Sequence, residues 1–113
     1  MADTTLTETA VEVDNLIIEA GEVVERTILA DQVLTRGTLL TFTTGKMVKT
    51  VADGQIDAIV KDDIDTTGAD AQANVYYTGV YKKSVVEDET GITVTEAMQD
   101  SARVNGLLIG TRE

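Results

Sequence analysis

Residues 35–81 decide the fold, and they read TRGTLLTFTTGKMVKTVADGQIDAIVKDDIDTTGADAQANVYYTGVY. Three short apolar runs, at residues 38–42, 56–60 and 73–81, are separated by glycine-marked turns and by an acidic loop. Short runs rich in β-branched and aromatic residues between such turns are typical of strands. The segment therefore predicts a compact β module.

Turn signals in and around this segment predict the order of the strands. Residues 43–46 read Thr-Thr-Gly-Lys, a tight turn that would join a strand over 38–43 to one over 47–51 as a hairpin. A further turn is expected at Asp53-Gly54. The other expected elements are a strand over 23–29, a break at Asp31-Gln32, a short buried strand over 56–60, a loop over 62–70 and one long strand over 73–81.

Only one segment, close to the C-terminal end, predicts a good helix. Thr93 with Glu96 three residues later matches a capping box, and Thr95 is the alternative N-cap. Asn105-Gly106 is a helix stop, after which residues 107–109 form a short closing strand. We therefore expect a mostly β (α+β) fold: one small β-sandwich or barrel-like domain over residues 11–113, with one or two short helices.

The first residues predict an extended N-terminal arm over residues 1–10. Four threonines among the first nine residues favour extended chain over helix. The segment lacks a strong apolar face, so we expect it to be disordered alone and able to add as a strand to another protein. The candidate binding residues of this arm are Thr4, Thr5, Leu6, Thr7, Glu8, Thr9 and Val11.

Composition narrows the function classes. The chain has 113 residues, the size of one domain, and a net charge of −11, which disfavours binding to nucleic acid or to anionic lipid surfaces. It has no Cys and no His, which removes disulfides, thiolate metal sites and the commonest general base. We find neither a membrane-spanning run nor a signal peptide, so synthesis in the cytoplasm is expected.

The acidic loop Asp63-Ile64-Asp65-Thr66-Thr67-Gly68 mimics the start of an EF-hand calcium loop. The bidentate Glu that such a loop needs at its twelfth position is replaced by Asn74. A solvated loop between strands is the better interpretation. We therefore predict that the protein needs no metal and no cofactor.

Two further patterns could carry chemistry. Lys49 beside a Met-containing turn faintly resembles a biotin- or lipoyl-carrying hairpin, but it lies along the second arm of the expected hairpin and not at its tip. The acidic runs 62–63 and 87–89 are adjacent carboxylates in expected exposed loops, which favours solvated side chains over acid–base catalysis. We interpret Lys46 and Lys49 as solvent-facing and predict that the protein is not an enzyme.

Two side-chain predictions concern the residues around the first and last strands of the segment. Arg36 has no catalytic partner in sequence, so we expect it to make a structural hydrogen bond. Tyr76 and Tyr77 fall on opposite faces of one strand, so one is expected in the core and the other at an interface.

The order of several short pieces resembles one family, the head decoration proteins of tailed bacteriophages related to the lambda protein D. The resemblance spans residues 34–109, and residues 11–33 match none of its pieces. The pieces are Arg36-Gly37-Thr38-Leu39-Leu40, Thr44-Gly45-Lys46, the acidic-ended run 57–65, Val75-Tyr76-Tyr77-Thr78-Gly79 and Gly106-Leu107-Leu108-Ile109.

The resemblance implies a structural virion protein on the outer capsid surface. It implies a homotrimer at three-fold positions of the expanded head, with the arm adding a strand to the major capsid protein and stabilising the shell. The structural residues it implies are Arg36, Gly37, Leu40, Gly45, Tyr76, Gly79 and Gly106. Two alternatives stay open: a small carrier or regulatory β module of an enzyme complex, and a host-recognition surface domain of the virion.

Overall fold

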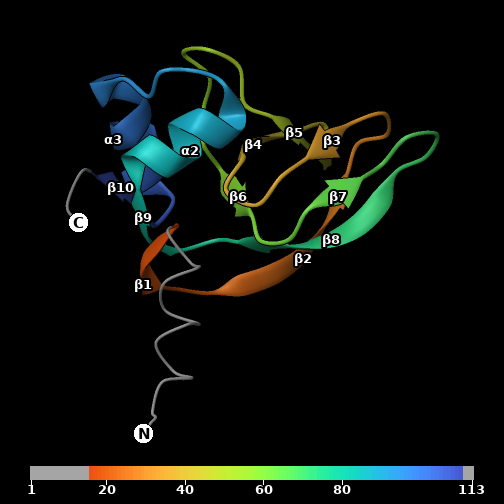
Figure 1. Ribbon diagram of the computed structural model, residues 1–113, viewed down its shortest axis with the longest axis horizontal. Helices are drawn as coiled ribbons and strands as arrows, with labels where there is room; N and C mark the ends of the chain where they lie inside the picture. Colours follow the sequence, from red (N-terminus) through yellow and green to blue (C-terminus); the bar gives the residue numbers. More distant parts are fainter. Residues whose placement is uncertain (1–15, 111–113) are drawn as a thin grey trace, which may run out of the picture.

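The computed structural model describes residues 16–110 and has a mostly β fold with two helices, which confirms the predicted class. Figure 1 shows the helices together at one end of the molecule and the strands β3 and β7 at the other. The elements are β1 (Ile17–Ala20), β2 (Val23–Ile28), β3 (Val33–Leu34), β4 (Leu39–Thr43), β5 (Lys46–Lys49), β6 (Ala58–Val60), β7 (Ile64–Asp65), β8 (Ala71–Tyr76), β9 (Gly79–Lys82), α2 (Lys83–Thr90), α3 (Glu96–Val104) and β10 (Leu107–Gly110).

Five strands close a small barrel in the order β2-β5-β4-β6-β8. The predicted hairpin is confirmed, because β4 and β5 pair antiparallel from Leu40↔Lys49 to Thr43↔Lys46 around the turn. β2 pairs with β8 along all six of its residues but meets β5 through one parallel pair, Ile28↔Met47. The buried residues inside are all aliphatic: Ile28, Leu34, Leu40, Met47, Ala58, Val60 and Val75.

A second sheet, β1-β9-β10, lies beside the barrel and packs with the helices around a second core. The two cores share one wall, because successive residues of a strand point to opposite faces. In β8, Val75 belongs to the barrel core and Tyr76 to the second core. The remaining short strands, β3 and β7, form a two-stranded ladder through Val33↔Asp65 and Leu34↔Ile64.

The prediction of one continuous strand over residues 73–81 was wrong. The segment divides into β8, which belongs to the barrel, and β9, which belongs to the second sheet. Gly79 has φ +124°, a conformation that L side chains rarely adopt. At the break, the Thr78 hydroxyl accepts a hydrogen bond from the Glu22 backbone N–H (2.7 Å). Alternating apolar residues run through this break, so the pattern does not reveal it.

The helix α2 was missed, and the acidic residues 87–89 lie on it and not in an exposed loop. Its sequence KSVVEDET contains β-branched residues, and its N-terminus has no side-chain cap. Tertiary contacts hold it instead: Val86 is fully buried, and the Thr90 hydroxyl accepts the Leu39 backbone N–H at 2.8 Å. Intrinsic propensity is a weak guide where packing supplies the stability.

The predicted C-terminal helix is confirmed as α3, with Thr95 as its N-cap. The Thr95 hydroxyl accepts the Met98 backbone N–H at 3.3 Å, and Asn105 is the C-cap. Gly106, at φ +94°, then turns the chain into β10, the predicted closing strand. Three short strands were not expected: β1, β3, and β7 inside the predicted acidic loop. Among residues 16–110, neither helix combines the length and the apolar character that crossing a membrane requires.

Candidate functional site

Most of the structural residues that the family resemblance implies lie at the junction between the barrel and the second sheet. The Arg36 Nη1 donates to the Tyr76 hydroxyl at 3.0 Å and to the Lys61 carbonyl oxygen at 2.7 Å. Its guanidinium carbon also lies 5.5 Å from the centroid of the Tyr76 ring. The predicted structural hydrogen bond of Arg36 is therefore confirmed.

These contacts continue from Tyr76 to the second sheet, and together they form one contact set at the junction. The rings of Tyr76 and Tyr81 lie with their centroids 5.3 Å apart. Tyr81 is fully buried, its hydroxyl donates to the Thr78 carbonyl oxygen at 2.6 Å, and burial raises the pKa of its phenol. A buried phenol needs such a partner, and this one ties the ring to the break between β8 and β9.

Gly79 and Gly106 complete this contact set at the point where the backbones of β1, β9 and the turn before β10 approach one another. The Gly79 N–H donates to the Gly106 carbonyl oxygen at 3.2 Å. A Cβ atom at Gly79 would lie 2.7 Å from the Tyr81 hydroxyl oxygen and 2.8 Å from the Glu19 carbonyl oxygen. Only glycine therefore fits between β1, β9 and the Tyr81 hydroxyl without a shift of the neighbouring atoms.

Leu40 and Gly45 lie apart from this junction. Leu40 is fully buried in the barrel core. Gly45 forms the tip of the β4–β5 hairpin at φ +86°, where an added Cβ atom would meet nothing within 4 Å. Tyr76 is the core member of the tyrosine pair, while Tyr77 is half-buried under the Arg26 guanidinium, 4.8 Å from its ring centroid.

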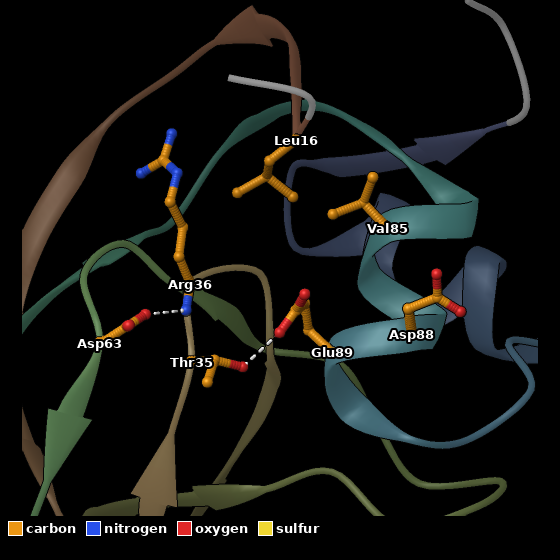
Figure 2. Close-up of a pocket in the computed structure, with 7 residues that line it drawn as sticks. All are labelled: Leu16, Thr35, Arg36, Asp63, Val85, Asp88 and Glu89. Carbon is orange, nitrogen blue, oxygen red and sulfur yellow. Dashed lines mark hydrogen bonds between the residues drawn. The ribbon is translucent and has the colours of Figure 1, made fainter. Parts of the chain in front are cut away.

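A surface cleft of about 440 Å³ opens beside Arg36 (Figure 2). It is lined by Leu16, Thr35, Arg36, Asp63, Val85, Asp88 and Glu89. Figure 2 shows that two of the carboxylates accept hydrogen bonds from neighbouring residues of the chain. Asp63 accepts a hydrogen bond from the Arg36 backbone N–H at 2.8 Å, and Glu89 accepts one from the Thr35 hydroxyl. The Glu89 bond fastens the loop before β4 to α2, and the Asp63 bond fastens it to the segment between β6 and β7, so the cleft is a structural junction lined by carboxylates.

Gly37 lies in the same junction and lets α2 approach this loop. It has φ +100°, and a Cβ atom there would lie 3.2 Å from the Cγ of Glu89. Its backbone N–H donates to the Val60 carbonyl oxygen at 3.0 Å. The resemblance residues Arg36 and Gly37 thus connect the barrel wall to the helix side of the molecule.

The acidic loop does not gather its carboxylates around one point. Asp63 is bound to Arg36, whereas Asp65 accepts the Thr67 hydroxyl at 2.6 Å and the Thr67 backbone N–H at 2.9 Å. The two bonds from Thr67, the side-chain bond first, lower the pKa of Asp65. Within residues 16–110, the structure holds no group of three or more acidic, His or Cys side chains that could bind a metal ion.

Lys49 is the exposed last residue of β5, well past the hairpin tip at residues 44–45, as the sequence predicted. Lys46 is not simply solvent-facing, because its Nζ lies 2.6 Å from Asp70 Oδ2. This hydrogen bond, together with the Ala30 backbone N–H, lowers the pKa of Asp70. The hairpin therefore has a fixed polar contact to the start of β8.

Sequence reasoning missed the contact that fastens α3 to the barrel. Asp57 Oδ1 accepts the Gln55 side-chain amide (2.8 Å) and the Asn105 side-chain amide (2.9 Å). Its other oxygen accepts the Phe42 backbone N–H at 2.7 Å. Asn105 was interpreted only as a helix stop, and nothing in the spacing of residues 57 and 105 signals this contact.

The predicted arm residues Thr4, Thr5, Leu6, Thr7, Glu8, Thr9 and Val11 lie outside the described residues. Neither a family model nor a curated protein matches the chain. The resemblance to phage head decoration proteins therefore stays a prediction.

Proposed function

We propose that this chain is a structural protein of a phage particle that binds the outer surface of the expanded head and stabilises it. The observation that supports this most is the contact set at the junction. Pieces that carry the resemblance, from Arg36, Tyr76-Gly79 and Gly106, are far apart in sequence and meet in one place. They hold the barrel and the second sheet together, which is the role the resemblance implies for them.

The chemistry of the cleft supports a structural role. Asp63 and Glu89 accept hydrogen bonds from the neighbouring loop, and Arg36 is bound to Tyr76 and Lys61. Acid–base catalysis by a pair of carboxyl groups needs the two groups in different environments facing a substrate. Side chains that bind one another across a loop–helix contact instead stabilise a rigid body.

The proposed partners are two further copies of the chain and the major capsid protein. A trimer of a chain with a net charge of −11 must be held by apolar and backbone contacts, since its charges repel. The proposed capsid contact is strand addition by the arm, residues 1–10. Backbone hydrogen bonds would supply affinity in that contact, and alternate side chains specificity.

The test is co-sedimentation of the purified protein with phage heads isolated before and after expansion. We expect stoichiometric binding to expanded heads and little binding to unexpanded ones. Replacing residues 1–10 with a glycine–serine segment of equal length should weaken binding at least about tenfold while leaving the melting temperature within about 2 °C, because the sequence of this segment lacks a strong apolar face.

Three results would contradict the proposal or redirect it. Equal binding to both forms of the head, or none to either, would contradict it directly. A covalent adduct on Lys49 in the intact mass of the protein would favour the carrier module. Particles that carry the protein on tail fibres would favour host recognition.

A further inference from the structure

Within residues 16–110, one edge of β2 forms a single residue pair with a neighbouring strand. On its other side β2 pairs with β8 along Val23–Ile28, but towards β5 it has the single pair Ile28↔Met47. The β4–β5 hairpin turns at residues 44–45, so β5 begins at Lys46 and is too short to cover the rest of β2. Figure 1 shows β2 along the margin of the molecule, with β8 beside it.

The hydrogen-bond pattern shows which backbone groups this edge presents. The Tyr77 N–H donates to the Glu22 carbonyl oxygen at 2.8 Å. In an antiparallel ladder the bonded pairs alternate, so the N–H and C=O groups of Val23 and Glu25 point away from β8. The Glu25 carbonyl oxygen accepts Arg26 Nη1 at 2.9 Å, and among the described residues the other three groups have no protein partner.

The side chains beside this edge are apolar and acidic. Val23 is 42% exposed, and Glu22 and Glu25 are both exposed. Neither carboxylate forms an ion pair with a lysine or arginine among residues 16–110. An added strand would therefore meet an apolar position beside Val23 and a negative position beside Glu25.

Along Glu22-Val23-Val24-Glu25, successive side chains point to opposite faces, so the two glutamates lie on opposite faces with the valines between them. We infer that the β2 edge is a docking site for an extended segment of another protein in which two aliphatic residues stand between two lysines or arginines. Backbone groups of the segment bind those of Val23 and Glu25, and its cations lie against Glu25 and Glu22. The Arg26 guanidinium covers one carbonyl oxygen and moves aside if that group is used. This inference does not depend on the proposed role in a phage head.

Charge decides against a second copy of the chain as the occupant. Two β2 edges that paired antiparallel would bring Glu22 and Glu25 of one copy against the same residues of the other. Like charges that face each other across strands are destabilising, and each copy already has a net charge of −11. A segment with positively charged side chains is instead attracted to Glu22 and Glu25.

The experiment titrates the full-length, isotope-labelled protein with synthetic eight-residue peptides and follows its backbone amide signals. The probe has Lys-Val-Val-Lys at its centre with two threonines on each side. One control has the same composition with the lysines and valines exchanged, and a second control is the probe with every internal amide N-methylated. We expect the probe peptide to shift the Val23 and Glu25 signals and slow their hydrogen exchange, and both controls to bind at least about fivefold more weakly.

A matched pair of variants separates local from overall charge. Glu25→Lys should weaken binding of the probe peptide about five- to tenfold, since it turns a favourable cross-strand pair into a repulsive one. Asp62→Lys changes the net charge equally in an exposed loop and should change the affinity less than about twofold. Circular dichroism of both variants checks that the fold is intact.

Two outcomes would overturn the inference. Equal binding of the N-methylated peptide, or equal weakening by both variants, would mean that the peptide is attracted by overall charge alone. Failure of the probe peptide to bind at millimolar concentration would mean that Glu22 and Glu25 only guard an open edge against aggregation.

Discussion

The barrel and the second sheet with its helices are stabilised in different ways. Buried residues of the barrel core are all aliphatic, and its central hairpin is contiguous in sequence. The second core contains both buried tyrosines and buried residues from two helices and from the five strands β4, β6, β8, β9 and β10. Its assembly depends on single polar contacts at Thr78, Thr90 and Asn105. Removing one contact should therefore harm the second region more than the barrel.

The largest expected effect comes from a glycine at the junction. Gly79→Ala places a Cβ atom within 3 Å of the Tyr81 hydroxyl and the Glu19 carbonyl oxygen, at a φ of +124°. We expect a loss of about 3 kcal/mol or more in the free energy of unfolding. The matched control is Gly45→Ala at the hairpin tip, where the Cβ meets nothing within 4 Å, and this should cost about 1 kcal/mol from backbone conformation alone.

Urea unfolding of both variants measures this difference. Similar losses for Gly79→Ala and Gly45→Ala would mean that the junction relaxes around an added methyl group. The comparison between a rigid junction and a tolerant barrel would then be wrong.

This contrast also explains what the sequence predicted and what it did not. Alternation and turn residues predicted the hairpin, and Thr95 with Asn105-Gly106 predicted α3, because those signals are local. The break at Thr78, the helix α2 and the Asp57–Asn105 contact depend on partners distant in the chain. Arg36 was predicted to make a structural hydrogen bond, but its partner Tyr76, forty residues away, was visible only in the structure.

The next largest effect tests the attachment of α2 to the barrel. Thr90→Val keeps the shape of a buried side chain but leaves the buried Leu39 N–H without its acceptor. We expect a loss of about 2 kcal/mol, whereas Thr90→Ser, which keeps the hydroxyl, should lose about 1 kcal/mol from the missing methyl group. Thermal unfolding would compare the two variants. If Thr90→Ser were the more destabilising one, methyl packing and not the hydrogen bond would hold α2.

A smaller effect is expected where α3 meets the barrel. Asp57→Asn replaces one carboxylate oxygen with an amide group that cannot accept, so one donor among Phe42, Gln55 and Asn105 loses its partner. We expect a loss of about 1 kcal/mol. Hydrogen exchange should speed up in α3 more than in β4 and β5. Uniform acceleration across the protein would show that the two regions unfold as one unit, which would contradict separate stabilisation.

The smallest effect concerns the polar contact of the barrel, Lys46–Asp70. The pKa of Asp70 is lowered from 3.8, first by the hydrogen bond to Lys46, so the folded protein holds this carboxylate ionised more strongly than the unfolded chain does. A depressed pKa contributes stability above the ordinary value, and that contribution is lost as the pH falls through the lowered value. Asp70→Asn should therefore lower the melting temperature slightly at about pH 7, and the difference from the unmodified protein should shrink as the pH falls below the ordinary range of a carboxyl group. Because the pair is exposed, salt at about 0.5 M should shrink the difference at neutral pH. A difference that persists in acid would mean that Asp70 acts through the Ala30 backbone bond and not through its charge.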